Sequence, residues 1–134
     1  MKLRSFVLVC WTMVTLALTA SANDQKATGY ASWYGEDHRG RLMANGKKFN
    51  PDKLTAASWF YPLGTRVRVT ALDENTSRRG TKSTPRTVLV TITDRGPAKE
   101  LVRGGRIIDL GHAAFKKLAH PDLGLIQVQV QALN

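Results

Sequence analysis

The sequence predicts a mainly β protein: a small closed barrel of short strands with one short α-helix, following an N-terminal signal peptide. Apolar and polar residues alternate along several short runs, which is typical of half-buried strands. One run near the C-terminus has helical spacing instead. Once the leader is removed the chain has no cysteine, so disulfides cannot stabilise an open sheet. Closing the sheet removes its exposed edges, which favours a barrel.

The first 22 residues resemble a cleaved secretory signal, leaving residues 23–134 as one domain. Lys2 and Arg4 precede an apolar run, and Ala20-Ser21-Ala22 offers the small-x-small pattern of a cleavage site. The alternative is a membrane anchor, but the run is shorter than the roughly 20 residues that span a bilayer. Cys10 lies inside the apolar run rather than at its end, so we expect no lipidation. We therefore expect export to the periplasm or cell envelope, without stable membrane insertion.

The chain is strongly basic, with a formal net charge of +10 that removal of Lys2 and Arg4 lowers by two. A basic exported protein would meet anionic wall polymers, acidic lipid headgroups or the carboxylates of stem peptides. Export argues against nucleic acid as a partner. The alternative is that the charge serves only solubility.

Five runs carry strand patterns. In order they are "TGYASWYG" (28–35), "TRVRVTAL" (65–72), "TVLVTIT" (87–93), "RIIDL" (106–110) and "LIQVQVQAL" (125–133). In the runs 65–72, 87–93 and 125–133, the alternation predicts that the valines and isoleucines of each run share one face.

The run "GHAAFKKLAH" (111–120) predicts the helix, because Ala114, Phe115 and Leu118 recur at helical spacing and Pro121 follows. Asp109 is a candidate cap for this helix, with a catalytic role as the alternative. Residues 73–86 are polar throughout and predict a cationic loop.

Between the first two strand runs, Asn45-Gly46 predicts a tight turn with a left-handed residue. Five apolar residues outside the clearest alternating patterns are assigned to the core: Met43, Phe49, Leu54, Leu63 and Ile108.

Most catalytic chemistries lack their residues. The histidines His38, His112 and His120 have no metal-ligand spacing, and nucleophile elbows and phosphate-binding glycine loops are missing, so we expect neither metal nor cofactor. What remains is the carboxylates, aromatics and arginines of carbohydrate chemistry. Asp94 follows a strand run and precedes Arg95. It either performs acid–base chemistry, or accepts backbone N–H bonds in a turn and pairs with Arg95.

A set of short motifs spreads from Gly29 to about Leu133: "ASWYG", "ANG", "LTAA", "PLGTRVRV", "DRGP" and "RIIDL". In this order and spacing they resemble the rare lipoprotein A (RlpA) family of septal lytic transglycosylases. The resemblance implies a six-stranded double-psi β-barrel related to expansins. It also implies cleavage of peptidoglycan glycan strands between N-acetylmuramic acid and N-acetylglucosamine, leaving 1,6-anhydromuramic ends.

In such a reaction the C6 hydroxyl of the sugar is the nucleophile, so one carboxyl group can act as acid and then as base. The resemblance assigns that role to Asp94. The family's glutamate after "ANG" is Lys47 here, and its histidine after Ala-Ala is Ser58. A lysine beside Asp94 would favour the ionised carboxylate and oppose acid catalysis; Glu36 or Asp37 could replace the missing carboxylate.

The other functional hypotheses follow from these substitutions. One is a non-catalytic peptidoglycan-binding or expansin-like wall-loosening module, and a weaker one is a secreted interaction domain. We expect a monomer whose partner is the glycan strand. Aromatic faces stack on sugars and arginines meet carboxylates, although core packing and solvated charge remain the alternatives. The predicted substrate-binding residues are Tyr34, Asn45, Lys47, Ser58, Trp59 and Arg95.

Overall fold

The computed structural model describes residues 26–72 and 84–133. The predicted signal peptide and most of the predicted loop at 73–86 lie outside these ranges. Within them, no helix has the length and apolar character needed to cross a membrane.

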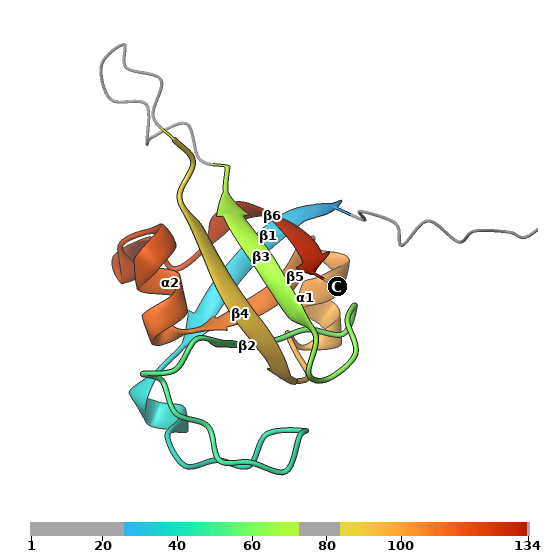
Figure 1. Ribbon diagram of the computed structural model, residues 1–134, viewed down its shortest axis with the longest axis vertical. Coiled ribbons are helices and arrows are strands. Elements are labelled where there is room, and N and C mark those ends of the chain that lie inside the picture. Colours follow the sequence, from blue (N-terminus) through green and yellow to red (C-terminus); the bar gives the residue numbers. More distant parts are fainter. Residues whose placement is uncertain (1–25, 73–83, 134) are drawn as a thin grey trace, which may run out of the picture.

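Six strands close into a barrel, which confirms the predicted fold class (Figure 1). The order around the barrel is β1-β5-β2-β4-β3-β6. The pairs β1/β5 and β2/β4 are parallel and the other four are antiparallel. The strands are β1 (Lys26–Tyr34), β2 (Thr55–Ala57), β3 (Arg66–Ala71), β4 (Thr87–Asp94), β5 (Arg106–Gly111) and β6 (Ile126–Leu133).

The alternating residues fill the barrel, as predicted. Val69 pairs with Val88 on β4 and with Val130 on β6, and all three side chains are buried. Cross-strand partners share a face of the sheet, so these contacts repeat along the barrel as an apolar interior. The arginines of β3 alternate outward and are exposed.

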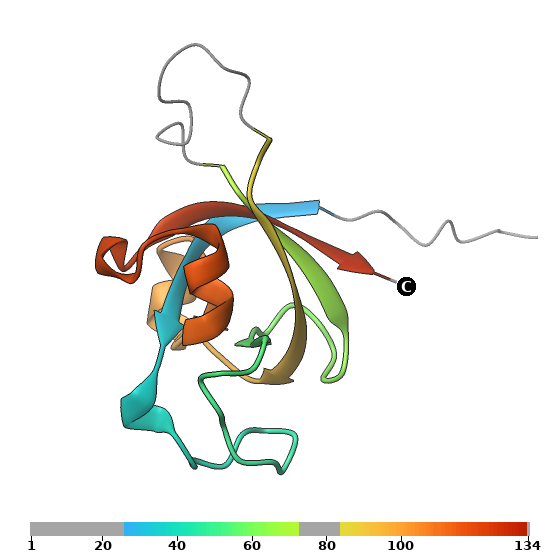
Figure 2. The same cartoon turned by 60° about the vertical axis from the view of Figure 1, so that its left-hand side comes forward.

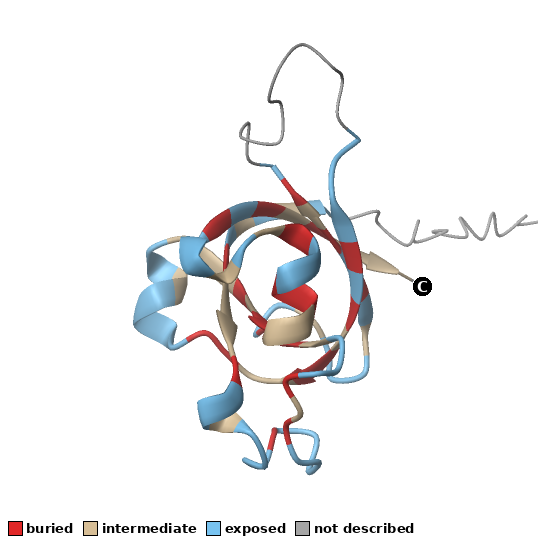
Figure 3. Ribbon diagram, turned by 90° about the vertical axis from the view of Figure 1, so that its left-hand side faces the viewer, coloured by how far each residue is buried: buried red, intermediate tan, exposed pale blue. Residues whose placement is uncertain are grey.

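Helix α2 (His112–Leu118) covers one end of the barrel, as the view along the barrel shows (Figure 3). It buries Ala114, Phe115 and Leu118, the three residues that predicted it. The prediction of a single helix was nevertheless incomplete. The structure also has α1 (Lys99–Arg103) and the 3₁₀ turns η1 (Glu36–His38) and η3 (Pro121–Leu123). Each of these is one turn or slightly more, too short for an apolar period to reveal it.

The predicted helix cap was wrong. Gly111 precedes α2 and no side chain caps it. Asp109 instead points its carboxylate at Arg106, whose guanidinium nitrogens donate to Asp109 Oδ1 over 3.0 and 3.2 Å.

The connection between β1 and β2 extends away from the barrel as a long loop (Figure 2). It contains a small hairpin in which Leu42 bridges Lys48, and Gly46 has the predicted left-handed conformation with φ 82°. Met43 and Phe49 are buried as predicted, and the Phe49 ring lies 4.3 Å from that of Tyr34. These two side chains therefore anchor the projecting loop to the barrel.

The core assignment was wrong for Leu54 and Leu63, which are each 38% exposed. Both lie in connections, where no strand or helix period orients the side chain and apolar character alone does not fix burial.

We predict that Phe115→Ala destabilises the protein by about 3–5 kcal/mol, because the ring is fully buried at the covered end of the barrel and its removal leaves a cavity. Urea unfolding measures the change. Leu101→Ala on α1 is the control: its side chain is 43% exposed, and it should cost well under half as much. Equal losses in the two variants would contradict the assignment of α2 to the core.

Candidate active site

Asp94 ends β4, and its side chain joins the barrel to the hairpin of the β1–β2 loop. Its Oδ1 accepts hydrogen bonds from Ala44 N at 2.9 Å and Arg95 N at 2.8 Å. Its Oδ2 accepts none from the residues that the structure describes. The turn interpretation is thus correct about the backbone donors. The half-buried carboxylate still has one oxygen available to a ligand.

The Arg95 guanidinium forms no ion pair with Asp94. Its Nη1 donates to the carbonyl oxygens of Ser58, at 2.7 Å, and Tyr61, at 2.6 Å. The side chain is half-buried and fastens the segment after β2 to the turn after β4. Arg95 therefore shapes the site through backbone contacts.

Ser58 has no exposed surface. Its hydroxyl donates to Ile107 O at 3.0 Å and accepts from Phe60 N at 3.2 Å, while its own N–H donates to Asp94 O at 3.1 Å. All its polar groups are used inside the fold.

Trp59 is the most exposed of the predicted site residues with an aromatic ring, at 46%, and Phe60 beside it is 54% exposed. The Trp59 indole N–H donates to Pro97 O at 2.7 Å, which fixes the ring against the turn that follows Asp94. Lys99 Nζ lies 5.4 Å from the ring centroid. An oriented aromatic surface of this kind can stack on a sugar ring.

A second carboxylate, Asp109, lies near Asp94. Ala57 on β2 pairs with Asp94 on one side and with Asp109 on the other, and paired residues share a face of the sheet. A β-bulge between Ala56 and Ala57 shifts the register so that Asp94, rather than Thr93, opposes Ala57. Sequence reasoning missed this pair, because nothing in the chain indicated that β2 lies between β4 and β5.

Gly96, in the turn after Asp94, lies close to Ala57 and Asp109. A Cβ at Gly96 would lie 3.4 Å from Ala57 Cβ and 3.5 Å from Asp109 Oδ2. In the sequence, only the "RIIDL" motif around Asp109 pointed to this residue as part of the site.

Tyr34 connects the two carboxylates. Its hydroxyl is buried and has no hydrogen-bond partner among the described residues. Burial raises the pKa of this hydroxyl, and the negative charges of Asp94 and then Asp109 raise it further. Burial also raises the pKa of Asp109, although Arg106 opposes this effect. Tyr34 therefore remains a neutral hydroxyl near two carboxyl groups.

Asn45 and Lys47 lie on the hairpin. Asn45 N donates to Thr93 O at 3.1 Å, and Asn45 Oδ1 accepts from Lys47 N at 3.0 Å, which closes the turn. The Lys47 side chain is exposed, and its ammonium forms no ion pair with Asp94 or any other described residue. A cavity of about 540 Å³ lies between this hairpin and the end of β4.

Glu36, the proposed replacement carboxylate, is engaged elsewhere. Its two oxygens accept from Arg39 at 2.6 and 3.0 Å, and this hydrogen bonding lowers the pKa of Glu36. An ionised, paired glutamate is a poor proton donor. Arg39 also bonds Asp52 at 3.0 Å, so this network braces the base of the loop.

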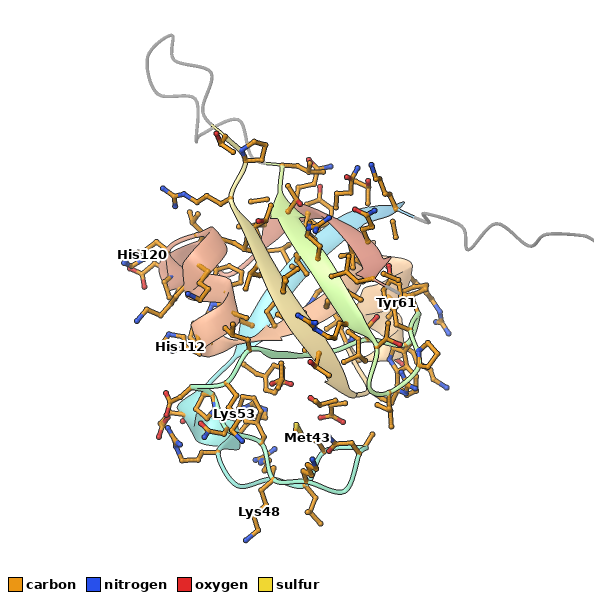
Figure 4. All side chains as sticks on the ribbon, viewed as in Figure 1. Met43, Lys48, Lys53, Tyr61, His112 and His120 are labelled. Carbon is orange, nitrogen blue, oxygen red and sulfur yellow. The ribbon has the colours of Figure 1, made fainter. Side chains whose placement is uncertain are left out.

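A second cavity, of about 630 Å³, lies beside α2 and is lined by Trp33, His112, Lys116 and His120 among others. Figure 4 shows His112 and His120 on the α2 side, and Met43 and Lys48 at the hairpin. The linings of the two cavities share no residue. The cavity beside α2 is therefore separate from the Asp94 site. Across residues 26–72 and 84–133, no three His, Cys, Asp or Glu side chains group as metal ligands.

Known proteins share both sequence and fold with this chain. A family model described as "Lytic transglycolase" matches residues 26–130. "Probable endolytic peptidoglycan transglycosylase RlpA" of Synechocystis sp. is 46% identical over 106 residues, which are 79% of this chain and 29% of that protein. "Endolytic peptidoglycan transglycosylase RlpA" of Pseudomonas aeruginosa is 37% identical over 115 residues, 84% and 30% of the two chains. The chain thus spans less than a third of either relative.

Two solved structures have the same fold. The Streptomyces papain inhibitor superposes with a TM-score of 0.57 at 26% identity, over 82% of this chain and 96% of that one. A mutant expansin of Clavibacter michiganensis, solved in complex with cellohexaose, has a TM-score of 0.56 at 18% identity, over 82% of this chain and 51% of the expansin.

We predict that Asp109 makes the protein less stable as the pH rises. Its pKa is raised on folding, so the folded chain holds this proton to a higher pH than the unfolded chain does, and stability falls as the pH passes upward from the ordinary aspartate value of about 4. Urea unfolding across a pH series should show a flatter profile for Asp109→Asn. Asp122→Asn, at a side chain that is 92% exposed, should keep the wild-type profile. Parallel profiles for wild type and Asp109→Asn would contradict the prediction.

Proposed function

The chain belongs to the RlpA-like double-psi β-barrel family of lytic transglycosylases, and from this premise we propose that it cleaves peptidoglycan glycan strands by intramolecular transglycosylation, with Asp94 as the acid and base. The bond cleaved would be the one between N-acetylmuramic acid and N-acetylglucosamine. The product would carry a 1,6-anhydromuramic end.

The observation that carries the proposal is the environment of Asp94. Two backbone N–H groups fix Oδ1, and Oδ2 faces no described donor. A carboxyl group oriented in this way can protonate the glycosidic oxygen through one atom without losing its anchor. The same oxygen can then accept the proton of the C6 hydroxyl as that hydroxyl attacks C1, so no water enters the bond-forming step.

Asp109 places a second carboxyl group at this end of the barrel. Burial raises its pKa, although Arg106 opposes this effect, and β2 lies between Asp109 and Asp94, with Ala57 paired to both. The neutral Tyr34 hydroxyl lies near both carboxyl groups. We assign Asp109 the place of the site's second carboxyl group, since Lys47 stands here where the family pattern has a glutamate.

Sugar binding would use the exposed aromatic surface next to Asp94. Trp59 and Phe60 present their rings beside the turn, and the Trp59 indole N–H is already bonded within the protein. The ring is therefore oriented before a ligand arrives, which lowers the entropy lost on binding. Arg95 and Ser58 contribute by holding this segment in place.

A second candidate function is glycan binding without cleavage. Lys47 and Ser58 occupy the positions of the family's glutamate and histidine, and the Ser58 hydroxyl is consumed by backbone contacts. The expansin likeness is one of fold. In either case we propose an exported monomer of the periplasm or cell envelope whose partner is the glycan strand and not nucleic acid.

We predict that Asp94→Asn lowers the rate of 1,6-anhydro product formation by about 100-fold or more, because the amide keeps an oxygen for the two N–H donors but cannot transfer the proton. The assay incubates glycan strands stripped of stem peptides with residues 23–134 and identifies the ends by mass spectrometry. Asp122→Asn should retain wild-type activity.

Three outcomes are decisive in this assay. Reducing ends in place of anhydro ends would replace transglycosylation with hydrolysis. Full activity of Asp94→Asn would remove Asp94 from the chemistry. Co-sedimentation of the wild type with the cell-wall sacculus, without any product over a broad pH range, would establish the binding function instead.

A further inference from the structure

The cavity between the hairpin and the end of β4 is strongly cationic. Lys47, Lys48 and Lys53 line it, and its lining contains no aspartate or glutamate. None of the three ammonium groups forms an ion pair with a described residue. Arg39 and Arg106, by contrast, are each paired with carboxylates of the chain. The positive charge in the cavity is therefore available to a ligand.

The rest of the lining suits a sugar. Met43, Leu63 and Ile92 supply apolar surface, and Asn45 and Thr93 add polar groups. Thr55 also lines the cavity, and its buried hydroxyl lies beside that of Tyr34. Apolar faces, hydroxyl partners and cations together match a sugar that bears a carboxylate.

The cavity adjoins the proposed catalytic residue. Thr93 lines it and directly precedes Asp94. The hairpin that forms its other side is held by Asn45 N to Thr93 O at 3.1 Å and by Ala44 N to Asp94 Oδ1 at 2.9 Å. A glycan strand with its scissile bond at Asp94 would thus place a neighbouring sugar at the cavity.

We propose that this lysine-lined cavity binds carboxylate groups of the strand, so that the chain selects glycan with free carboxylates over glycan in which they are neutralised. The inference rests on the proposed function for the identity of the polymer. It adds the chemical group of that polymer that the cavity binds. Free carboxylates come from two sources, the lactyl group of a stripped muramic acid and the stem peptide. Lys47 then has a role of its own: a substrate contact where the relatives' motif has a glutamate.

The test measures binding rather than cleavage, by titration calorimetry on the wild type and on two charge-matched triple variants. One variant carries Lys47→Gln, Lys48→Gln and Lys53→Gln. The control carries Lys116→Gln, Lys117→Gln and Arg103→Gln on the two helices, where Lys116 also lines the cavity beside α2. The ligands are stripped glycan strands, the same strands with every carboxylate converted to a methylamide, and peptide-bearing strands.

We expect the wild type to bind stripped strands about 10-fold more tightly than methylamidated strands, the sum of three partly exposed charge contacts. The cavity variant should bind both equally weakly, and the control should keep the wild-type preference. Tighter binding of stripped than of peptide-bearing strands identifies the lactyl carboxylate as the group bound, and the reverse order identifies the peptide.

Equal wild-type affinity for the charged and methylamidated strands would overturn the proposal. Loss of the preference in the control would also overturn it and would transfer the interaction to the cavity beside α2 or to overall charge. Because no step of the test requires bond cleavage, the absence of anhydro products would refute the proposed function and leave this result intact.

Discussion

The three residues of β2 hold the site together. Thr55–Ala57 pairs in parallel with β4 and antiparallel with β5, and this short strand is what closes the barrel between them. The bulge in its pairing with β4 brings Asp94 opposite Ala57, where a regular register would have placed Thr93. Asp109 reaches the same residue from the other side. With this pairing both carboxyl groups act on the buried Tyr34 hydroxyl, and the turn at Gly96 lies beside Asp109.

The longer elements could be predicted because their side chains alternate over enough residues to define a face. β3, β4 and β6 repeat a valine or isoleucine at every second position, and α2 repeats apolar residues at helical spacing. Alanine pairs in β2 and single turns such as α1 carry no such period. The site was predictable where a motif marks it, as at Asp94. For Asp109 the sequence left a helix cap and a catalytic role open, because its partner strand cannot be read from local sequence.

The fold separates two kinds of charge. The carboxyl groups of the proposed site are partly buried, and Asp109 has its cation, Arg106, three residues away on the same strand. The three cavity lysines lie on the loop between β1 and β2, which reaches away from the barrel and is braced by Arg39. The Lys47 ammonium forms no ion pair with Asp94. The lysine at this position therefore matters more for the charge of the cavity than for the protonation of Asp94. Ser58, in contrast, is absorbed into the backbone hydrogen bonding that supports the turn.

A crystal structure of the Asp94→Asn variant with a stripped glycan oligomer bound would test the account most directly. The account predicts the glycosidic oxygen within about 3 Å of the side chain at position 94. It also predicts a sugar face on Trp59 and a muramic carboxylate among Lys47, Lys48 and Lys53. A strand bound along the cavity of His112 and His120, with position 94 uncovered, would contradict it.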